Sequence, residues 1–274
     1  MLVYQIEAPA KLTLRFHVRA RRSDGYHQIE GEMVALSLVD LIKIDTSVSL
    51  SGVAMLADPL IGDHDRYRVV VDSSNSIVRA LDFLGVTAQV EVRKRIPHGA
   101  GLGGGSSDAA AILRAFGYQG DPSTVAVLGA DVAPSLVGGH VCVGGVGDQV
   151  ELLADIERDY VLFLPAFSIS TAAVYRAFDQ VGSDGGDNDL FLAACEIEPK
   201  LGVLAAELSQ RFHRPVKLAG SGSTLYFEAT FAELGLGSQS SVPGIELGML
   251  STTVGSVVAI ECHTLPRPTS YNHG

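Results

Sequence analysis

The sequence predicts an α+β protein whose two halves meet near residue 150, and three observations support this fold class. Residues 11–19, KLTLRFHVR, alternate between polar and apolar side chains, as a half-buried strand does. Residues 72–85 carry apolar side chains at helical spacing and end at a glycine, which is typical of a helix stop. After about residue 150 the pattern changes to a buried strand followed by long helical stretches.

The remaining elements are expected in both halves. In the first half, the expected strands cover residues 11–19, 33–44, 67–71 and 88–96, with a hairpin over 140–153. Residues 45–66 lack a clear period and are expected to be loop with strands whose positions stay open. The expected helices cover 72–85, a run from about Ser106, and 123–128. In the second half we expect a strand over 159–166, helices over 170–181 and 187–212 with a break at Pro199, a strand–turn–strand unit over 215–229 and a strand over 257–265.

Composition restricts the class of protein and its partners. With 274 residues, of which 47% are hydrophobic and 19% charged, the chain suits one large or two modest globular domains. A net charge of −11 disfavours nucleic acid, and no apolar run approaches the roughly 18 residues of a membrane span. Three widely spaced cysteines without a CxxC pattern favour reduced thiols in a cytoplasmic protein. We expect neither a signal peptide nor a membrane partner, and leave monomer and homodimer as alternatives.

A glycine-rich stretch, PHGAGLGGGSSDAAA, leads into a predicted helix and requires an explanation, because bare backbone is entropically costly. Gly99, Gly101 and Gly104 satisfy the dinucleotide pattern GxGxxG, but the strand before them carries Glu91 and Arg93. A central parallel strand would not tolerate that polar face, so a Rossmann fold is disfavoured.

The remaining readings of the glycine stretch are a flexible connector and a phosphate-binding loop. A Walker loop fails because no Gly-Lys-Ser/Thr follows the glycines. Uncovered N–H groups at a helix N-terminus form an anion site, and we expect Ser106 and Ser107 to cap that helix. Basic residues near both the N-terminus and the loop suit a small phosphorylated ligand. The phosphate-binding loop is therefore the favoured reading.

Five motifs carry a resemblance to a known family: APAKLTLRFHV, RRSDGYH, KRIPHGAGLGGGSSDAA, GADV and GSGST, in this order. They resemble the motifs of the GHMP kinase superfamily of galactokinase, homoserine kinase, mevalonate kinase and phosphomevalonate kinase. Within it they are most similar to the branch that phosphorylates the 2-hydroxyl of a cytidine diphosphate derivative of methylerythritol, in the non-mevalonate route to isoprenoid precursors. The resemblance covers about residues 5–230 and is strongest before residue 150.

This resemblance implies a fold, a cofactor and catalytic residues. The fold would be a two-domain GHMP-kinase-like α+β fold, with an N-terminal ribosomal-protein-S5-domain-2-like half over 1–150 and a C-terminal ferredoxin-like half over 151–274. Lys11 and Asp131 would be catalytic, and ATP would be delivered with Mg²⁺. The ATP phosphates would be bound by Pro97, His98, Gly99, Ala100, Gly101, Leu102, Gly103, Gly104, Gly105, Ser106 and Ser107. The metal ligands stay open between Ser106, Ser107 and Asp108.

The resemblance also implies how a cytidine diphosphate substrate would be recognised. Tyr26 would stack on the cytosine ring and His27 would hydrogen-bond its edge, which is a sound way to select a base. The substrate-binding set would be Thr13, Tyr26, His27, Gly220, Ser221 and Gly222, with the glycine turn closing over the substrate phosphates. A plain aromatic hairpin and a plain strand-to-strand turn are the alternatives for these two segments.

Departures from the family pattern keep other functions open. Thr13 stands where the family has asparagine, and Ala133 and Pro134 follow GADV where the family has proline and an aromatic. The second aromatic wall of the cytidine pocket has only candidates, Tyr175 and Phe178. The alternatives are therefore another GHMP-type kinase, of the homoserine or mevalonate type, and a nucleotide-binding relative whose catalysis has lapsed.

Overall fold

The structure, a computed structural model, describes residues 3–58, 71–240 and 245–268, which form one extended mixed sheet with helices packed on it. The strands are β1 (Val3–Arg21), β2 (His27–Asp45), β3 (Gly52–Ala57), β4 (Gln89–Lys94), β5 (His140–Gly144), β6 (Gln149–Leu152), β7 (Asp159–Pro165), β8 (Lys217–Leu218), β9 (Leu225–Glu228), β10 (Glu246–Thr252) and β11 (Gly255–Leu265). The helices are α1 (Ser76–Leu84), α2 (Gly104–Ala115), α3 (Val132–Val137), α4 (Thr171–Val181), α5 (Phe191–Ile197), α6 (Pro199–Phe212) and the 3₁₀ helix η2 (Pro122–Leu128). The α+β class is confirmed.

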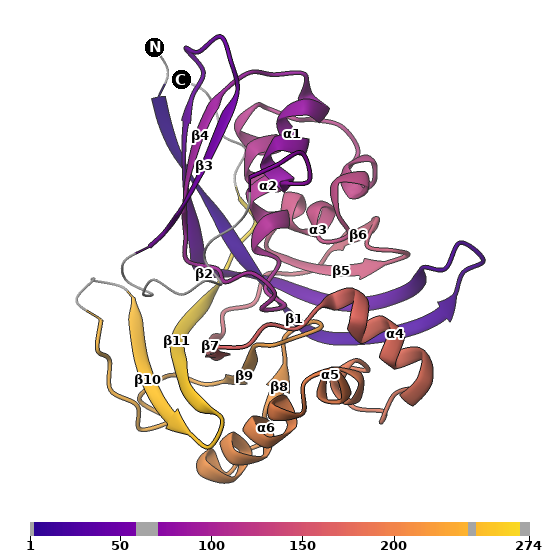
Figure 1. The fold of residues 1–274 in the computed structure, drawn as a ribbon, viewed down its shortest axis with the longest axis vertical. Coiled ribbons are helices and arrows are strands. Elements are labelled where there is room, and N and C mark those ends of the chain that lie inside the picture. The colour runs from indigo at the N-terminus through magenta and orange to yellow at the C-terminus, as the bar shows by residue number, and fades with distance from the viewer. Residues whose placement is uncertain (1–2, 59–70, 241–244, 269–274) are drawn as a thin grey trace.

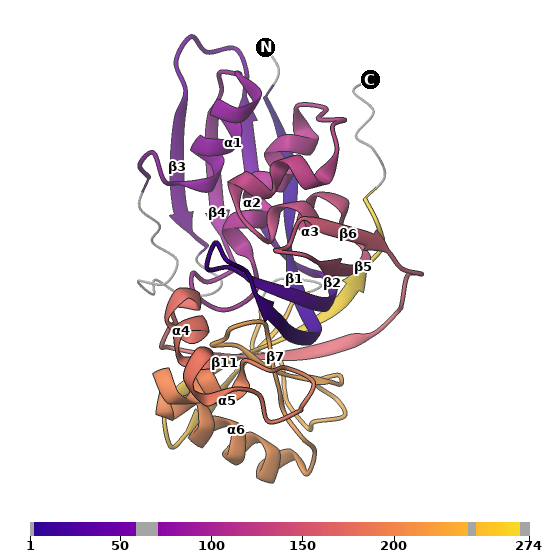
Figure 2. The ribbon, with the colours of Figure 1, turned by 90° about the vertical axis from the view of Figure 1, so that its right-hand side faces the viewer.

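The long strand β2 connects the whole sheet. β1 runs antiparallel along one of its edges, while β5, β11 and β4 pair in turn with the other edge. β11 also pairs with β7 and β10, so it runs from the lower half of the molecule into the upper half (Figures 1 and 2). The sheet is therefore continuous across the expected boundary near residue 150, and the division into two domains stays a prediction.

Three hydrophobic cores hold the layers together. One lies between α1, α2 and the β1–β2–β4 strands, and another between α4, α5, α6 and the strands of the lower half (Figure 1). The third joins the two halves, and it contains Leu12 of β1 and Tyr226 of β9. Ala100 and Leu102 of the glycine loop are buried in this third core. Apolar burial thus fixes the loop at the junction of the two halves.

Most predicted elements are confirmed, including the hairpin over 140–153 and the helix break at Pro199, which separates α5 from α6. The prediction omits α3 and β10. Within the segment expected to be loop with unplaced strands, residues 52–57 form β3, which pairs parallel with β4. Residues 67–70 of the expected strand 67–71 lie outside the described residues. None of the helices in the described ranges has the length and apolar character that a membrane crossing requires.

Candidate active site

Lys11 and Asp131, 120 positions apart in the sequence, meet beside the glycine loop. The Nζ atom of Lys11 lies 3.3 Å from Oδ2 of Asp131, and it donates to the Thr13 hydroxyl at 3.2 Å. The Lys11 side chain is 10% exposed and that of Asp131 is 32% exposed, so the pair is open to a ligand mainly from the Asp131 side. The two residues expected to be catalytic are therefore in contact, and their roles stay a prediction.

A bulge in β1 determines where Lys11 points. The register between β1 and β2 shifts between Pro9 and Lys11 and again between Thr13 and Arg15. Since a bulge takes a residue out of the regular ladder, the Lys11 N–H is able to donate to the carbonyl of Leu102 in the glycine loop, at 3.0 Å. The strand and the loop are thus joined at the residue whose ammonium faces Asp131.

Asp131 occupies the N-cap position of α3 without capping it. Its backbone has φ −90° and ψ 0°, and its side chain accepts no hydrogen bond from the helix. This sparsely allowed backbone region is where many active-site residues lie. Because the carboxylate makes no bond to its own helix, it is available to Lys11 and to a ligand. A merely capping aspartate, the ordinary reading of this position, is therefore disfavoured.

The glycine loop has the backbone of an anion site. Gly99, Gly101 and Gly103 have φ values of +64°, +78° and +68°, which other residues rarely adopt. Within the described part of the chain, the N–H groups of residues 99–103 make no hydrogen bond. When left-handed residues alternate with others ahead of a helix, their N–H groups point toward a shared concavity that binds phosphate. The prediction that residues 97–107 bind phosphate fits this geometry.

The loop contacts the second half of the chain and is only partly covered. Gly101 lies so close to the opposite turn that a Cβ on it would lie 2.0 Å from the carbonyl oxygen of Ala219. The Thr224 N–H also donates to the carbonyl of Ala100 at 3.1 Å. Pro97, Ala100, Leu102 and Ser107 are buried, while His98 and Gly105 are exposed and the other loop residues are half-buried. The exposed surface of the loop is therefore formed mainly by its glycines, Ser106 and His98.

The start of α2 differs from the prediction. The helix begins at Gly104 with Gly103 as its N-cap residue, and no side chain caps it. The expected capping by Ser106 and Ser107 is therefore wrong, because the glycines already take the helical path two residues earlier. The Ser107 hydroxyl donates instead to the carbonyl of Pro9 at 2.5 Å, which ties α2 to β1. The uncapped N–H groups of the first turn lie open for a ligand.

A buried ion cluster lies beneath the loop, and of its members only Asp108 was named in the predicted site, as a candidate metal ligand. Lys94 donates to the carboxylates of Asp40 and Asp108, and the three residues are 3%, 0% and 1% exposed. Burial opposes the charge on Lys94, but the two carboxylates raise its pKa to about 12. Burial raises the pKa of Asp108 to about 8, although the Lys94 charge acts against it. The available signal was a lysine in phase with Val90 and Val92 on the apolar face of its strand.

The second glycine segment, residues 219–224, faces the same ammonium. A Cβ on Gly220 would lie 3.1 Å from Lys11 Nζ, and the Ser221 hydroxyl lies 2.8 Å from that of Thr171. The buried Asn188 side chain donates to the carbonyls of Leu218 and Gly220, at 3.0 and 2.8 Å. Sequence reasoning missed Asn188, since nothing in its local pattern reveals a contact 30 residues away.

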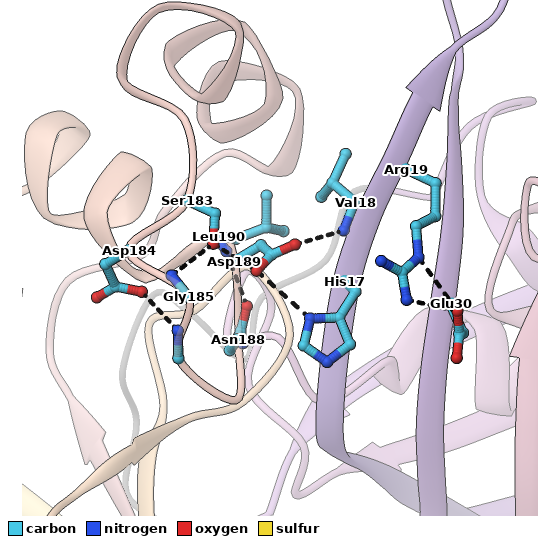
Figure 3. Close-up of polar contacts among 11 residues, drawn as sticks. His17, Val18, Arg19, Glu30, Ser183, Asp184, Gly185, Asn188, Asp189 and Leu190 are labelled. Carbon is cyan, nitrogen blue, oxygen red and sulfur yellow. Dashed lines mark hydrogen bonds and ion pairs between the residues drawn. The ribbon is translucent and has the colours of Figure 1, made fainter.

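The loop that carries Asn188 is itself bound to β1. Figure 3 shows the carboxylate of Asp189 accepting from the Val18 N–H at 2.9 Å and facing Nδ1 of His17 at 3.4 Å. The Ser183 hydroxyl donates to the same carboxylate at 2.5 Å. Burial raises the pKa of Asp189, but the hydrogen bonds from Ser183, Val18 and His17 outweigh burial and hold this pKa below its ordinary value. The loop therefore links the second glycine segment to the strand that carries Lys11.

His27 and Tyr26, expected to bind a base, have different environments. His27 is held by Asp179 at 2.7 Å and stacks on Tyr175, with ring centroids 5.3 Å apart, while Phe178 meets its edge. Tyr26 is 68% exposed on the tip of the β1–β2 hairpin. Burial, and then the charge of Asp131, raise the pKa of Tyr175.

No cluster of three His, Cys, Asp or Glu side chains suited to a metal is present among the described residues. Asp108 is bound to Lys94 and the Ser107 hydroxyl to Pro9, which leaves Ser106 as the freest of the three metal-ligand candidates. A Cβ on Gly129 would lie 3.5 Å from the Ser106 hydroxyl, so this hydroxyl is near the Asp131 segment. Such a site fits a Mg²⁺ ion that is held mostly by phosphate oxygens and water.

Comparisons with known proteins show what the chain is similar to. Residues 75–150 match the family model described as the GHMP kinases N terminal domain. A 4-diphosphocytidyl-2-C-methyl-D-erythritol kinase of Paracoccus denitrificans is 32% identical over 241 residues, which are 80% of this chain and 84% of that protein. The protein of the same name from Carboxydothermus hydrogenoformans is 29% identical over 264 residues, 82% of this chain and 87% of its own.

Solved structures give the same result for the fold. A crystal structure of 4-(cytidine 5'-diphospho)-2C-methyl-D-erythritol kinase superposes with a TM-score of 0.68 and 26% identity, covering 94% of this chain and 99% of that one. A mevalonate kinase structure superposes with a TM-score of 0.59 at 14% identity, covering 96% and 100%, and shows the fold alone. The expected GHMP-kinase fold is confirmed.

The fold, the glycine loop and the matched domain together define a kinase of the GHMP class. Within that class, the Paracoccus relative aligns with this chain over most of the length of both proteins. The chain belongs to the family of 4-diphosphocytidyl-2-C-methyl-D-erythritol kinases.

Proposed function

We propose that this protein transfers the γ-phosphate of ATP to the 2-hydroxyl of 4-diphosphocytidyl-2-C-methyl-D-erythritol, a step toward isoprenoid precursors. The observation that carries the proposal is the 3.3 Å contact between Lys11 and Asp131 beside a loop of free backbone N–H groups, in a chain of this family. The loop from Pro97 to Ser107 binds the triphosphate, and the lysine and the carboxylate meet at the phosphorus that is transferred.

Lys11 offsets the negative charge of the transferred phosphoryl group. Phosphoryl transfer spreads negative charge over the moving group, so the protein contributes mainly position and positive charge. The ammonium is buried, and it is held by Asp131, Thr13 and the close approach of Gly220. Because it cannot leave this position easily, it is preorganised for the transition state and loses little freedom during the reaction.

Asp131 acts on the acceptor hydroxyl. Its carboxylate bonds to Lys11 through Oδ2 and is partly exposed, so it is able to accept the proton of a bound hydroxyl or to orient that hydroxyl. General-base help of this kind contributes about 10²- to 10⁴-fold in rate. Mg²⁺ supplies neutralisation of the phosphate oxygens when it is bound, and Ser106 is the hydroxyl we assign to it.

The acceptor is recognised at the hairpin tip. Tyr26 stacks on the cytosine ring and His27 bonds its edge, with Asp179 fixing the orientation of the imidazole. Tyr175 and Phe178 already pack on His27, so they support this residue and leave the exposed Tyr26 to meet the base. Thr13, Gly220, Ser221 and Gly222 face the diphosphate.

The cysteines indicate the cellular location of the protein, and the composition of the site bears on its oligomeric state. Cys142, Cys195 and Cys262 are all free, which suits a reducing cytoplasm. One chain carries Lys11, Asp131 and both glycine segments, so a monomer is sufficient for the reaction and a homodimer is not required by the geometry.

An enzyme-linked assay of ADP release tests this function. The wild-type protein is given ATP and Mg²⁺ with the cytidine-diphosphate substrate, homoserine or mevalonate in parallel reactions. ADP release with the cytidine substrate alone supports the proposal. Release with homoserine or mevalonate instead assigns the chain to another GHMP activity, and ATP binding without turnover on any acceptor identifies a relative with lapsed catalysis.

A further inference from the structure

A cavity separate from the glycine loop lies between α3, the C-terminal end of β11 and the strands β1 and β2. Its volume is about 330 Å³. Close-packed interiors hold few voids larger than a water molecule, whereas pockets for small molecules start at roughly 300 Å³. Residues 97–107, all of them described, do not line this cavity, and of the residues assigned to the reaction only Lys11 does. The cavity is therefore a candidate site for a ligand other than ATP.

The floor of the cavity is one face of the sheet. Ala35 of β2 is paired with Lys11 of β1 on one side and with Leu265 of β11 on the other. Paired residues of an antiparallel sheet point to the same face, so these three side chains share the face that lines the cavity. The small methyl group of Ala35 leaves room for a ligand at the centre of this floor, and Leu265 makes one side of it apolar.

The wall on the side of α3 is formed by small residues and by the segment after β11. Ser135 lies in α3, and Gly138 and Gly139 follow this helix with φ values of +65° and +68°. A Cβ on Gly138 would lie 2.6 Å from the ring of Pro268. A Cβ on Gly139 would lie 2.8 Å from the backbone nitrogen of Arg267. The segment after β11 thus packs directly on bare backbone, which fixes the shape of the cavity and the place of Arg267.

The mouth of the cavity carries an arginine that is available to an anion. Arg267 and Glu7 line the cavity and are both exposed, so they mark where it reaches the surface. Within the described ranges, the Arg267 side chain makes neither an ion pair nor a hydrogen bond. A guanidinium binds a carboxylate through two parallel hydrogen bonds. Because Glu7 repels a second negative charge, a single carboxylate matches this mouth better than a dianion does.

The other cations that line the cavity are held by neighbouring groups. Arg114 of α2 donates to the carbonyl of Ser135 at 2.6 Å, and this bond ties α3 to α2. Lys11 faces Asp131 at 3.3 Å. Arg267 is therefore the partner for an anionic head group, and the rest of the lining is mainly apolar.

We propose that this cavity binds a carboxylate with a medium-length apolar chain, whose head group bonds to Arg267 and whose chain fills the space between Ala35, Ser135 and Leu265. The inference goes beyond the proposed function and does not depend on it, because neither the glycine loop nor the residues assigned to the cytidine substrate line the cavity. A ligand in this place contacts the helix that begins at Asp131, so the protein has a second binding site beside its reaction centre.

Two substitutions test the head group and the chain separately. Arg267→Ala removes the cation at the mouth. Ser135→Leu fills the cavity, and it breaks no side-chain hydrogen bond, because the Ser135 hydroxyl is buried without a partner among the described residues. The backbone carbonyl that Arg114 binds is unchanged. Arg93→Ala is the matched control, because Arg93 is also exposed, has no ion pair in the described part of the chain and does not line the cavity.

The probe is octanoate, titrated calorimetrically into the full chain, with acetate and octanol as comparison ligands. We expect one octanoate per chain, with a dissociation constant below about 1 mM. Acetate lacks the chain and octanol lacks the charge, so each should bind at least about tenfold more weakly. Arg267→Ala should raise the dissociation constant about fivefold or more and Ser135→Leu about tenfold or more, whereas Arg93→Ala should stay within about twofold of the wild type.

Octanoate that does not bind the wild type, or that binds either Arg267→Ala or Ser135→Leu as tightly as the wild type, contradicts the inference. Sedimentation of the wild type tests a different occupant. A dimer that Ser135→Leu dissociates would show that a second copy of the chain covers the cavity, which also contradicts the inference. Melting curves verify that each variant is folded. If Ser135→Leu does not fold, Arg267→Ala, at an exposed position, and its control still decide the outcome.

Discussion

The two glycine segments that face Lys11 are held in different ways. A Cβ on Gly103 of the first segment would lie 2.8 Å from the Lys11 side chain, and one on Gly220 of the second would lie 3.1 Å from its Nζ. The first segment is fixed from beneath, by buried ions and by the apolar anchors Ala100 and Leu102. The second is held by neutral groups, among them the Asn188 amide and the Thr171 hydroxyl.

The two segments therefore differ in the kind of contact that holds them. Buried charges are stable only when they are paired, so the first segment depends on the protonation state beneath it. The second segment depends on neutral hydrogen bonds, which are those of the Asn188 amide, of the Ser221 and Thr171 hydroxyls and of the Thr224 N–H.

The largest effect is expected where the two segments touch. Gly101→Ala places a Cβ 2.0 Å from the carbonyl oxygen of Ala219, at a φ of +78°, so one of the two backbones has to move. Steric overlap and the left-handed conformation together should lower the free energy of unfolding by about 3–5 kcal/mol. Urea unfolding measures this loss, and ADP release should fall with it.

The control for this substitution is Gly85→Ala. Gly85 ends α1 with a φ of +64°, but no atom lies within 4 Å of its added Cβ. It should lose only the conformational part, about 1–2 kcal/mol. If the two substitutions cost the same, the close contact between the segments is not a structural constraint.

An intermediate effect is expected at Asn188. Asn188→Asp removes both donors and sets a carboxylate against the carbonyls of Leu218 and Gly220. Leaving buried carbonyls unpaired should lower the free energy of unfolding by about 2–4 kcal/mol, and the altered turn should raise KM for the cytidine substrate. Chemical unfolding and steady-state kinetics at pH 7 measure the two effects.

Asp184→Asn is the matched control in the same loop (Figure 3). Asp184 is exposed, and an asparagine in its place keeps an oxygen that accepts from the Gly186 N–H. Its unfolding free energy should change by less than about 0.5 kcal/mol. An Asn188→Asp protein as stable and active as this control would show that the amide does not hold the second segment.

The smallest effect is the pH dependence of stability. The folded pKa of Asp108 is raised to about 8, above its unfolded value, so the folded state binds this proton more tightly. The contribution is complete below about pH 4 and is lost as the pH rises to about 8, by about 2 kcal/mol between pH 6 and 8. Urea unfolding at several pH values should show this slope in the wild type and a shallower one in Asp108→Asn. Equal slopes would contradict the assignment.

The sequence carries the local part of this structure. Alternation in β1 and β4, the glycine stop of α1 and the break at Pro199 are all set by neighbouring residues, and they are where expected. The glycine loop is visible from its density of glycines, whereas the role of Lys11 is predicted only from the family resemblance, because a lysine on a strand is more often a plain surface residue. Elements that depend on a distant partner, such as β3 on β4, have no local period, so their positions could not be predicted.

The missing parts of the site have the same cause. Lys94, Asp40 and Asp108 are charged residues that are stable in the interior only because three elements bring them together. The sequence shows each of them merely as an interruption of an apolar pattern. Asn188 bonds to backbone atoms 30 and 32 positions away, which no spacing rule anticipates. The bulges of β1 depend on β2, and they decide that Lys11 faces inward. Long-range geometry, and not residue type, limits what the sequence reveals.

The central claim is that Lys11 and Asp131 act on a phosphate that the glycine loop binds independently of them. The most direct measurement compares the ATP dissociation constant with single-turnover phosphoryl transfer in the wild type and in Asp131→Asn. The account predicts a transfer rate lowered by about 10²- to 10⁴-fold and an ATP dissociation constant within about threefold of the wild type. Transfer at the wild-type rate, or loss of ATP binding in step with the rate, would contradict it.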